Sequence, residues 1–439
     1  MSTLPKSCPQ GARKLTRAAD LDGAPPGSKG DLALVGGRLV DGRGGPSREG
    51  MSVLISDGTV TGIAEGSTVP CGCRTIDVGG RTILPGLIDA HVHLSSISLP
   101  APSRGELAYE ANVRPYGQAA ASRAMLEGGI TTARDVGSNG RELFALRRAI
   151  GAGLCPGPRL LLCGQIVSPT SPGGRLFSDM YRQADGPDEM RKAVREQIRQ
   201  GADLVKVMTT GALTVPREAV EPSQMTRAEL DAIVEESHRQ GFRVASHAEG
   251  LPGIRLSIDA GVDTIEHGEQ LHRAPELLDR MAELGIVLVP TLSVFKLVAE
   301  VQSCCFTPAL VDQAKRLRED AYATVAAARV AGVAIVMGFD SHPHGANAEE
   351  LVRLAHAGLT TAETVVAGTS GAAAACGLED VGSVVTGQLA DLLVVDGDPL
   401  ADVRVLADDA KRWLVLLGGR PVAGRALDAN DPTREVLDG

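Results

Sequence analysis

The chain has 439 residues, of which 43% are hydrophobic and 22% are charged, and its formal net charge is -10. This composition is typical of a globular protein and excludes general disorder. The negative charge disfavours a nucleic-acid partner, because no local cluster of Lys and Arg offsets it. No apolar run has the length of a membrane span, so we expect no membrane partner either.

Residues 1–30 are rich in Gly, Pro and polar residues and lack the apolar core of a signal peptide, so we predict a flexible leader. The eight cysteines are scattered and include no C-x-x-C pair. This pattern disfavours a disulfide scaffold and a zinc ribbon, and it fits a reducing, cytoplasmic location.

The next segment, residues 31–82, predicts short strands with hairpin turns. Its alternating runs "LALVGGRLVDGRG" and "MSVLISDGTVTGIAEG" each contain or end in Gly or Asp-Gly. Residues 381–439 return to this pattern in "LADLLVVDGD" and "RWLVLLGGRPVAG". Because each end is too small to bury a face alone, we predict one composite β-sandwich domain built from both ends.

Residues 83–380 alternate strand and helix patterns, which predicts an α/β fold. One helical segment, "TRAELDAIVEESHRQG", begins with a capping box of Thr226 and Glu229. Eight such units are what a (β/α)8 TIM barrel needs. The alternative is a doubly wound open sheet, which is disfavoured because no G-x-G-x-x-G follows a strand. The predicted strands are Leu87–Leu94, Ile130–Val136, Arg159–Val167, Leu204–Thr209, Arg243–Ala248, Thr264–His267, Val287–Val294 and Ala334–Asp340.

Polar residues mark the ends of several predicted strands. In "ILPGLIDAHVHLSS", His91 and His93 are two apart and would project from one face of a strand. The strand ends of a barrel share one mouth, so residues far apart in sequence can meet there. The others at these positions are Lys206, His247, His267 and Asp340.

Each of these residues also has an ordinary structural interpretation. A single histidine is more often a hydrogen-bonded core residue than a ligand, and Asp340 before a serine could cap a helix. All of these interpretations must hold at once if the residues do not form a site. The joint occurrence therefore favours a metal centre.

Lys206 lies within a strand that should be buried, where an unpaired ammonium is costly. Burial depresses a lysine pKa and leaves an amine, which can add carbon dioxide to become a carbamate. One carbamate oxygen would complete a first metal site with His91, His93 and Asp340, and the other a second site with His247 and His267. These nitrogen and oxygen ligands suit two divalent ions, with zinc expected and cobalt or manganese as alternatives.

The chain resembles the amidohydrolase superfamily, in particular its binuclear, carboxylated-lysine branch of prolidase-like, ochratoxinase-like and imidazolonepropionase-like proteins. The motifs that carry the resemblance run in order through residues 31–425: "LPGLIDAHVHL", "GGITTARDVG", "GADLVKVMTTGA", "ASHAEG", "GVDTIEHG", "MGFDSHPHGANAEEL" and "GQLADLLVVDGDPLADV". The resemblance implies a hydroxide bridging two metals as the nucleophile. It also implies that Asp340 acts first as general base and then as general acid, and that the protein is a homo-oligomer.

The substrate is predicted less sharply than the metal ligands. His344 matches a Pro-His-Gly sequence of these relatives, and Arg175 and Arg217 lie on loops predicted to rim the mouth, so all three are candidate substrate-binding residues. For each, a solvated surface role is the alternative. The loops "SPTSPGGRLFSDMY" and "GALTVPREAVEPSQMT" depart from dipeptidase relatives, which weakens the expectation of a dipeptide.

We therefore predict a metal-dependent amidohydrolase that cleaves a C–N bond in a small-molecule substrate such as an N-acyl amino acid, a dipeptide or a cyclic amide. The alternatives are a hydrolytic deaminase, which Lys206 disfavours, and a catalytically silent scaffold, which the full ligand set disfavours. Ester or lactone hydrolysis uses the same chemistry.

Overall fold

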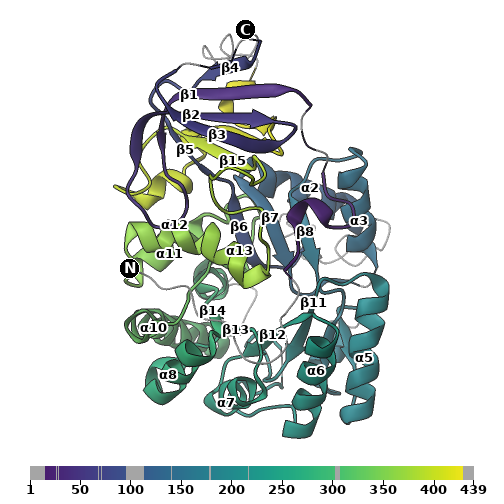
Figure 1. Cartoon of the computed structure of the whole chain (residues 1–439). Coiled ribbons are helices and arrows are strands. Elements are labelled where there is room, and N and C mark those ends of the chain that lie inside the picture. Colours follow the sequence, from purple (N-terminus) through teal and green to yellow (C-terminus); the bar gives the residue numbers. More distant parts are fainter. Residues whose placement is uncertain are drawn as a thin grey trace.

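Strands from the two ends of the chain lie together on one side of the molecule, and parallel strands with flanking helices form the other side (Figure 1). In the part of the chain that is described, no helix is long and apolar enough to cross a membrane. This computed structural model describes residues 15–428 apart from 26, 28, 68, 71, 95–112, 140, 177–178, 216 and 302–306.

The first region is an eight-stranded mixed sheet, ordered β17-β16-β15-β5-β1-β2-β3, with β4 paired to β1. The two chain ends join where β5 and β15 pair antiparallel, with Thr82 opposite Val395. The predicted association of the two ends is therefore present as a single sheet. Its strands are β1 (Asp31–Leu39), β2 (Arg48–Ser56), β3 (Thr59–Glu65), β4 (Arg74–Asp77), β5 (Thr82–Pro85), β15 (Leu392–Val395), β16 (Arg412–Leu417) and β17 (Arg420–Ala423).

Turn chemistry and side-chain alternation explain this sheet. Asp57 and Gly58 connect β2 to β3 with φ values of 46° and 78°, as a two-residue hairpin turn requires. In β15, Leu392 and Val394 enter the apolar core of the mixed sheet, whereas Leu393 and Val395 enter the core shared with the second region. All four residues of β15 are apolar, and both faces of the strand are buried.

The second region contains parallel strands in two groups, β6-β7-β8 and β10-β9-β11-β12-β13-β14. The strands are β6 (Leu87–Val92), β7 (Ile130–Asp135), β8 (Arg159–Leu162), β9 (Ile166–Ser168), β10 (Tyr181–Gln183), β11 (Leu204–Met208), β12 (Arg243–Ala248), β13 (Thr264–His267) and β14 (Val287–Val289).

Helices alternate with these strands and lie outside them (Figure 1). The capping box predicted for Thr226 and Glu229 is confirmed at the start of α6. The helices are α2 (Arg114–Glu127), α3 (Glu142–Gly151), α4 (Pro172–Leu176), α5 (Pro187–Gln200), α6 (Arg227–Arg239), α7 (Leu251–Ala260), α8 (Pro275–Leu284), α9 (Leu292–Lys296), α10 (Pro308–Ala331), α11 (Glu349–His356), α12 (Thr361–Ala367) and α13 (Ser370–Cys376).

Two predicted strands differ from the structure. The predicted strand Arg159–Val167 is divided into β8 and β9, because Gly164 takes a φ of 72° between them. The predicted strand Val287–Val294 was too long: β14 ends at Val289, and α9 begins at Leu292. Pro290 lies between them and has no N–H for a strand ladder.

The predicted strand Ala334–Asp340 is wrong as a regular strand, since it makes one isolated parallel bridge, between Leu288 and Ile335. Backbone hydrogen bonds still place this segment between β14 and β6. On one side Leu288 N donates to Ala334 O at 2.9 Å. On the other, Asp340 N donates to His91 O at 3.0 Å. These bonds hold Asp340 next to the end of β6.

Part of the segment predicted to be a flexible leader is described and contacts the second region. Thr16 forms a parallel bridge with Leu378, and Ala18 N donates to Asp380 Oδ1 at 2.5 Å. The side chains of Ala18 and Leu21 are buried. Residues 1–14 lie outside the described residues.

Candidate metal centre

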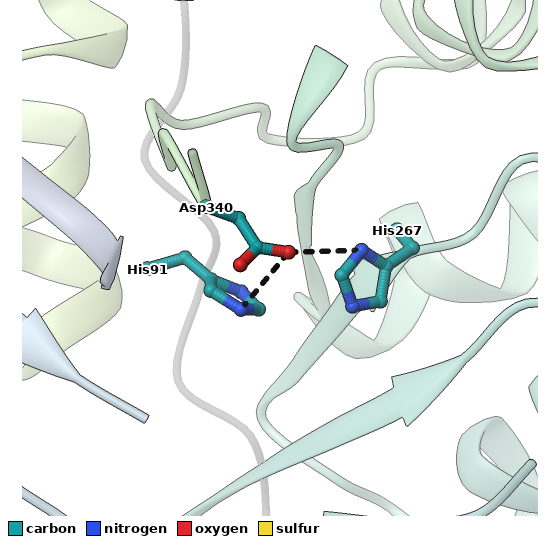
Figure 2. A group of neighbouring side chains, drawn as sticks. All are labelled: His91, His267 and Asp340. Carbon is teal, nitrogen blue, oxygen red and sulfur yellow. Dashed lines mark ion pairs between the residues drawn. The ribbon is translucent and has the colours of Figure 1, made fainter. Parts of the chain in front are cut away.

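The six predicted metal ligands come together at the C-terminal side of the parallel strands. Figure 2 shows the Asp340 carboxylate between the rings of His91 and His267, where its Oδ2 lies 3.7 Å from His91 Nε2 and 4.0 Å from His267 Nδ1. One donor atom from each of these three residues lies within 4.8 Å of the others, which makes them a candidate metal-binding group. The complete set is His91, His93, Lys206, His247, His267 and Asp340.

His91 and His93 have an arrangement that fits a shared cation. His91 Nδ1 lies 2.7 Å from Glu266 Oε2, and His93 Nδ1 lies 2.7 Å from Gly137 O. Both partners are acceptors, so each Nδ1 carries the ring proton and each Nε2 keeps its lone pair. The two Nε2 atoms are nevertheless 3.3 Å apart. Two nitrogen ligands of one tetrahedral zinc ion lie about 3.3 Å apart, so a cation fits between them.

Burial keeps these imidazoles neutral, which is the form that binds metals. Desolvation lowers the pKa of His93 to about 4 and the pKa of His91 well below its usual value. The positive charge of Lys206 acts in the same direction on both rings.

His247 and His267 form a second close pair, with ring centroids 4.4 Å apart. His247 Nε2 lies 3.1 Å from the Gly211 carbonyl, which leaves Nδ1 of this ring as the unprotonated nitrogen. His267 Nδ1 lies 2.7 Å from Thr291 Oγ1. Each of these two rings is therefore oriented by a contact between one of its nitrogens and a protein oxygen.

Lys206 lies in the middle of β11 with only 1% of its surface exposed. Burial lowers the pKa of its amine, and the charges of Glu266 and Asp340 oppose this effect. Its positive charge also lowers the pKa of His91, His93 and His267. A lowered pKa makes the neutral amine available for reaction with carbon dioxide.

Backbone strain is concentrated at this centre. His267, Thr291 and Asp340 have φ values of 73°, 49° and 41°, in the left-handed region that favours glycine. Each such residue costs on the order of 1–3 kcal/mol, and residues of this kind gather at functional sites. Burial also raises the pKa of Asp340 to about 8, against the opposing charge of Lys206.

Asp89 connects β6 to the segment that carries Asp340. Its Oδ1 accepts hydrogen bonds from His91 N at 3.0 Å and Phe339 N at 3.1 Å. Its Oδ2 accepts from Asn347 Nδ2 at 2.8 Å. Since Phe339 precedes Asp340, this fully buried carboxylate fixes the position of Asp340 relative to His91.

The candidate substrate-binding residues are less closely placed. His344 is buried, and neither of its ring nitrogens makes a well-formed hydrogen bond to another described residue. Arg175, on α4, and Arg217 are exposed. Their two loops are joined by a hydrogen bond from Gly173 N to Glu218 Oε1 at 2.7 Å. Among the described contacts, neither arginine reaches the six predicted ligands.

Several residues that orient the ligands were missed in the sequence, namely Asp89, Arg134, Glu266 and Thr291. A usable signal was present for the first three. Each is a charged residue within a strand that should be buried, in "LIDAH", "TTARD" and "TIEHG". A buried charge requires a partner at each of these three positions, as it does at Lys206.

Comparison with known proteins gives the family. Residues 82–422 match the model of the amidohydrolase family. This chain belongs to that family. The resemblance stated from the motifs is therefore confirmed, and the amidohydrolase is a hydrolase that acts on C–N bonds. Members of the family generally bind divalent metals, consistent with the candidate group at His91, His267 and Asp340.

Named relatives and solved structures cover most of the amidohydrolase chain. It is 28% identical to ochratoxinase of Aspergillus niger over 91% of its own length and 89% of that protein. It is 27% identical to imidazolonepropionase of Symbiobacterium thermophilum over 83% and 91% of the two chains. The crystal structure of a Xaa-Pro dipeptidase with bound methionine matches with a TM-score of 0.82, 30% identity and coverage of 90% and 100%. These similarities support a TIM-barrel-like fold with an additional domain.

Proposed function

We propose that the protein is a binuclear metal-dependent amidohydrolase that cleaves the amide-type C–N bond of an N-acyl amino acid, a dipeptide or a cyclic amide. In this proposal the parallel strands and segment 334–340 form a closed (β/α)8 barrel, and the mixed sheet forms a small sandwich beside it. The hydrogen bonds from segment 334–340 to β14 and to β6 support closure of the barrel.

One observation carries the proposal: the two unprotonated nitrogens of His91 and His93 face each other at 3.3 Å beside Asp340. Asp340 Oδ1 lies 3.5 Å from His93 Nε2. A shared cation accounts for this approach of electron-rich atoms. His91, His93 and Asp340 would hold the first ion, and His247 and His267 would hold the second.

Lys206 would connect the two ions as a carbamate. Its neutral amine would attack carbon dioxide, form an N–C bond and release a proton, which leaves an anion with two oxygens. Its position among the histidines and the lowered pKa of its amine support this role. Zinc is the metal that we propose from the nitrogen and oxygen ligands, with no cysteine among them.

The chain's own residues would then position the substrate and move one proton. When bound, the metal ions would polarise the scissile carbonyl and lower the pKa of the attacking water. Asp340 would accept the proton of that water and pass it to the leaving nitrogen, since its carboxylate lies 3.7 Å from His91 Nε2 and 3.5 Å from His93 Nε2. His344, Arg175 and Arg217 would contact the substrate, and an arginine would pair with a substrate carboxylate.

The names of the relatives support this bond type, because an ochratoxinase, an imidazolonepropionase and a Xaa-Pro dipeptidase are among them. We also propose a cytoplasmic, homo-oligomeric protein. The proposed substrates are small molecules, in accordance with the family.

The test is a hydrolysis screen of zinc-loaded protein on N-acyl amino acids, Xaa-Pro and Xaa-Arg dipeptides, aryl amides and cyclic ureides, with ammonia release followed in parallel. Asp340→Asn is the control for contaminating activity. Each N-acyl amino acid that is hydrolysed is also tested as its carboxamide, which lacks the negative charge. If Arg175 or Arg217 pairs with the substrate carboxylate, Arg175→Ala or Arg217→Ala should weaken binding of the acid and leave binding of the carboxamide unchanged. Release of ammonia from a ring or amidine carbon, or no turnover of any amide, would contradict the proposal.

A further inference from the structure

A buried ion pair connects two distant strands next to the candidate metal centre. Arg134 on β7 donates through Nη2 to Glu266 Oε1 on β13 at 2.9 Å. The side chains are 3% and 0% exposed. β7 and β13 belong to different sheets and are not paired with each other. The pair therefore crosses the interior of the TIM-barrel-like region through side chains alone.

All three nitrogens of the Arg134 guanidinium donate hydrogen bonds to buried oxygens. Its Nε donates to Ala90 O at 2.5 Å, directly before His91 in β6. Its Nη1 donates to Thr264 Oγ1 at 3.3 Å. The Thr264 hydroxyl in turn donates to Glu266 Oε1. Arg134 and Thr264 thus occupy one oxygen of Glu266 and fix the plane of its carboxylate.

The other oxygen of Glu266 meets a metal ligand. Oε2 lies 2.7 Å from His91 Nδ1, and both residues are fully buried. A carboxylate only accepts hydrogen bonds, so His91 must donate from Nδ1. Its Nε2 is then the unprotonated nitrogen that faces His93 and Asp340.

We infer that Glu266, held by Arg134 and Thr264, is a positioning residue that sets the tautomer of His91 for metal binding. This inference rests on the proposed function, since it requires His91 to be a metal ligand. Carboxylates that orient ligating histidines in this way typically change metal affinity by about 10–100-fold when they are removed.

The variant Glu266→Gln tests the inference, because it replaces one carboxylate oxygen, an acceptor, by an NH2 group, a donor, and keeps the shape of the side chain. The guanidinium of Arg134 can only donate, so the amide oxygen of the glutamine must face it, and the same oxygen can accept from the Thr264 hydroxyl. Its NH2 group then faces His91 and donates to Nδ1, which forces the ring proton onto Nε2. The nitrogen that should bind the metal becomes protonated.

The matched control is Asp391→Asn, which changes another buried arginine pair. Arg159 binds Asp391 through two hydrogen bonds of 2.6 Å and 3.0 Å, with both side chains 2% exposed. Among the described residues, the side-chain hydrogen bonds and ion pairs of Arg159 and Asp391 do not reach a candidate metal ligand. A merely structural role of Glu266 predicts that the two variants behave alike.

Zn²⁺ affinity is measured by competition with a chromophoric chelator on the full-length protein, with circular dichroism as the check of folding. We expect Glu266→Gln to bind Zn²⁺ about 10-fold or more weakly and Asp391→Asn to bind it as the wild type does. Wild-type affinity in Glu266→Gln, or equal losses in both variants, would overturn the inference. If the wild type binds no Zn²⁺, the proposed function fails instead.

A second readout follows the tautomer directly. In metal-free protein with 15N-labelled histidine, long-range 1H–15N spectra should show His91 protonated on Nδ1 in the wild type and on Nε2 in Glu266→Gln. The His91→Asn variant assigns the signal. Should Glu266→Gln not fold, Thr264→Val removes one support of the carboxylate and is expected to weaken Zn²⁺ binding in the same direction by a smaller factor. Unchanged affinity in that variant would count against the inference.

Discussion

Two buried arginine–carboxylate pairs lie in different regions of this amidohydrolase. Arg134 and Glu266 connect strands within the TIM-barrel-like region, and Arg159 and Asp391 connect β8 to the start of β15 in the mixed sheet. The third partner differs between them. Glu266 contacts the ring of His91, whereas Asp391 Oδ1 accepts from the backbone of Gly418 at 2.6 Å. An arginine–carboxylate pair can therefore orient a candidate metal ligand in one place and connect the two regions of the molecule in another.

The largest expected effect is on activity, at the centre next to the first pair. Lys206→Ala should lose metal retention and lower the hydrolysis rate by about 10³-fold or more, because it removes the proposed bridge between the ions. Metal content and steady-state rates check this, and short carboxylic acids should restore part of both. The control is Lys296→Ala, which changes a half-buried lysine that pairs with Glu349. Full metal content and normal rates in Lys206→Ala would remove the bridging role.

The second pair should respond through stability instead. Asp391→Asn leaves Arg159 with an incomplete buried partner and should lower the free energy of unfolding by about 3–5 kcal/mol. Chemical denaturation measures this loss, and the hydrolysis rate per folded molecule should stay at the wild-type value. A large drop in that rate at unchanged stability would break the distinction between the two regions.

Asp340→Asn separates chemistry from folding within the first region. The variant keeps the shape of the side chain but cannot accept the proton of the attacking water, so kcat should fall by about 10²-fold or more. Much of the second metal ion should remain bound, as elemental analysis can show. Wild-type kcat would assign the proton transfer to another residue.

A third buried carboxylate, that of Glu350, is bound by backbone N–H groups and a hydroxyl instead of by an arginine. Glu350 accepts from Leu292 N at 2.7 Å and from Ser293 N at 2.9 Å, and burial raises its pKa from 4.5 to about 7. Between these two pH values the folded protein keeps a proton that the unfolded chain releases. Stability from this group is therefore present below pH 4.5 and is lost as the pH rises through 7.

The expected size of this loss is about 2 kcal/mol between pH 5 and pH 7. Unfolding free energies measured in Glu350→Gln and in the wild type across this range should differ in slope, with the variant less dependent on pH. Parallel curves for the two proteins would show that Glu350 titrates alike in both states.

The candidate ligands were easier to identify in the sequence than the groups that orient them. His91, His93, His247 and His267 could be recognised because a histidine at the end of an apolar strand is conspicuous, and the structure brings them together with Lys206 and Asp340. The contact of Glu266 with His91 could not be predicted, because it crosses between strands that are not paired. The spacing of residues in the sequence predicts which side chains share a face of one strand, but it does not predict contacts between different strands.

The strand pattern was also predicted unevenly. β12 and β13 have the predicted bounds, since each is followed within two residues by a glycine, Gly250 and Gly268. The segment Ala334–Asp340 has the composition of a strand but pairs irregularly, and its last residue takes a strained backbone conformation. The requirement to place Asp340 beside His91 outweighs local strand propensity there.

The pairing of β5 with β15 has a consequence for biosynthesis. A growing chain makes Thr82–Pro85 more than 300 residues before Leu392–Val395. Until the later strand leaves the ribosome, one edge of β5 has no permanent neighbour and is open to pairing with other chains. Completion of the mixed sheet is therefore a late event in the formation of this protein, and shortening either end of the chain should damage the same sheet.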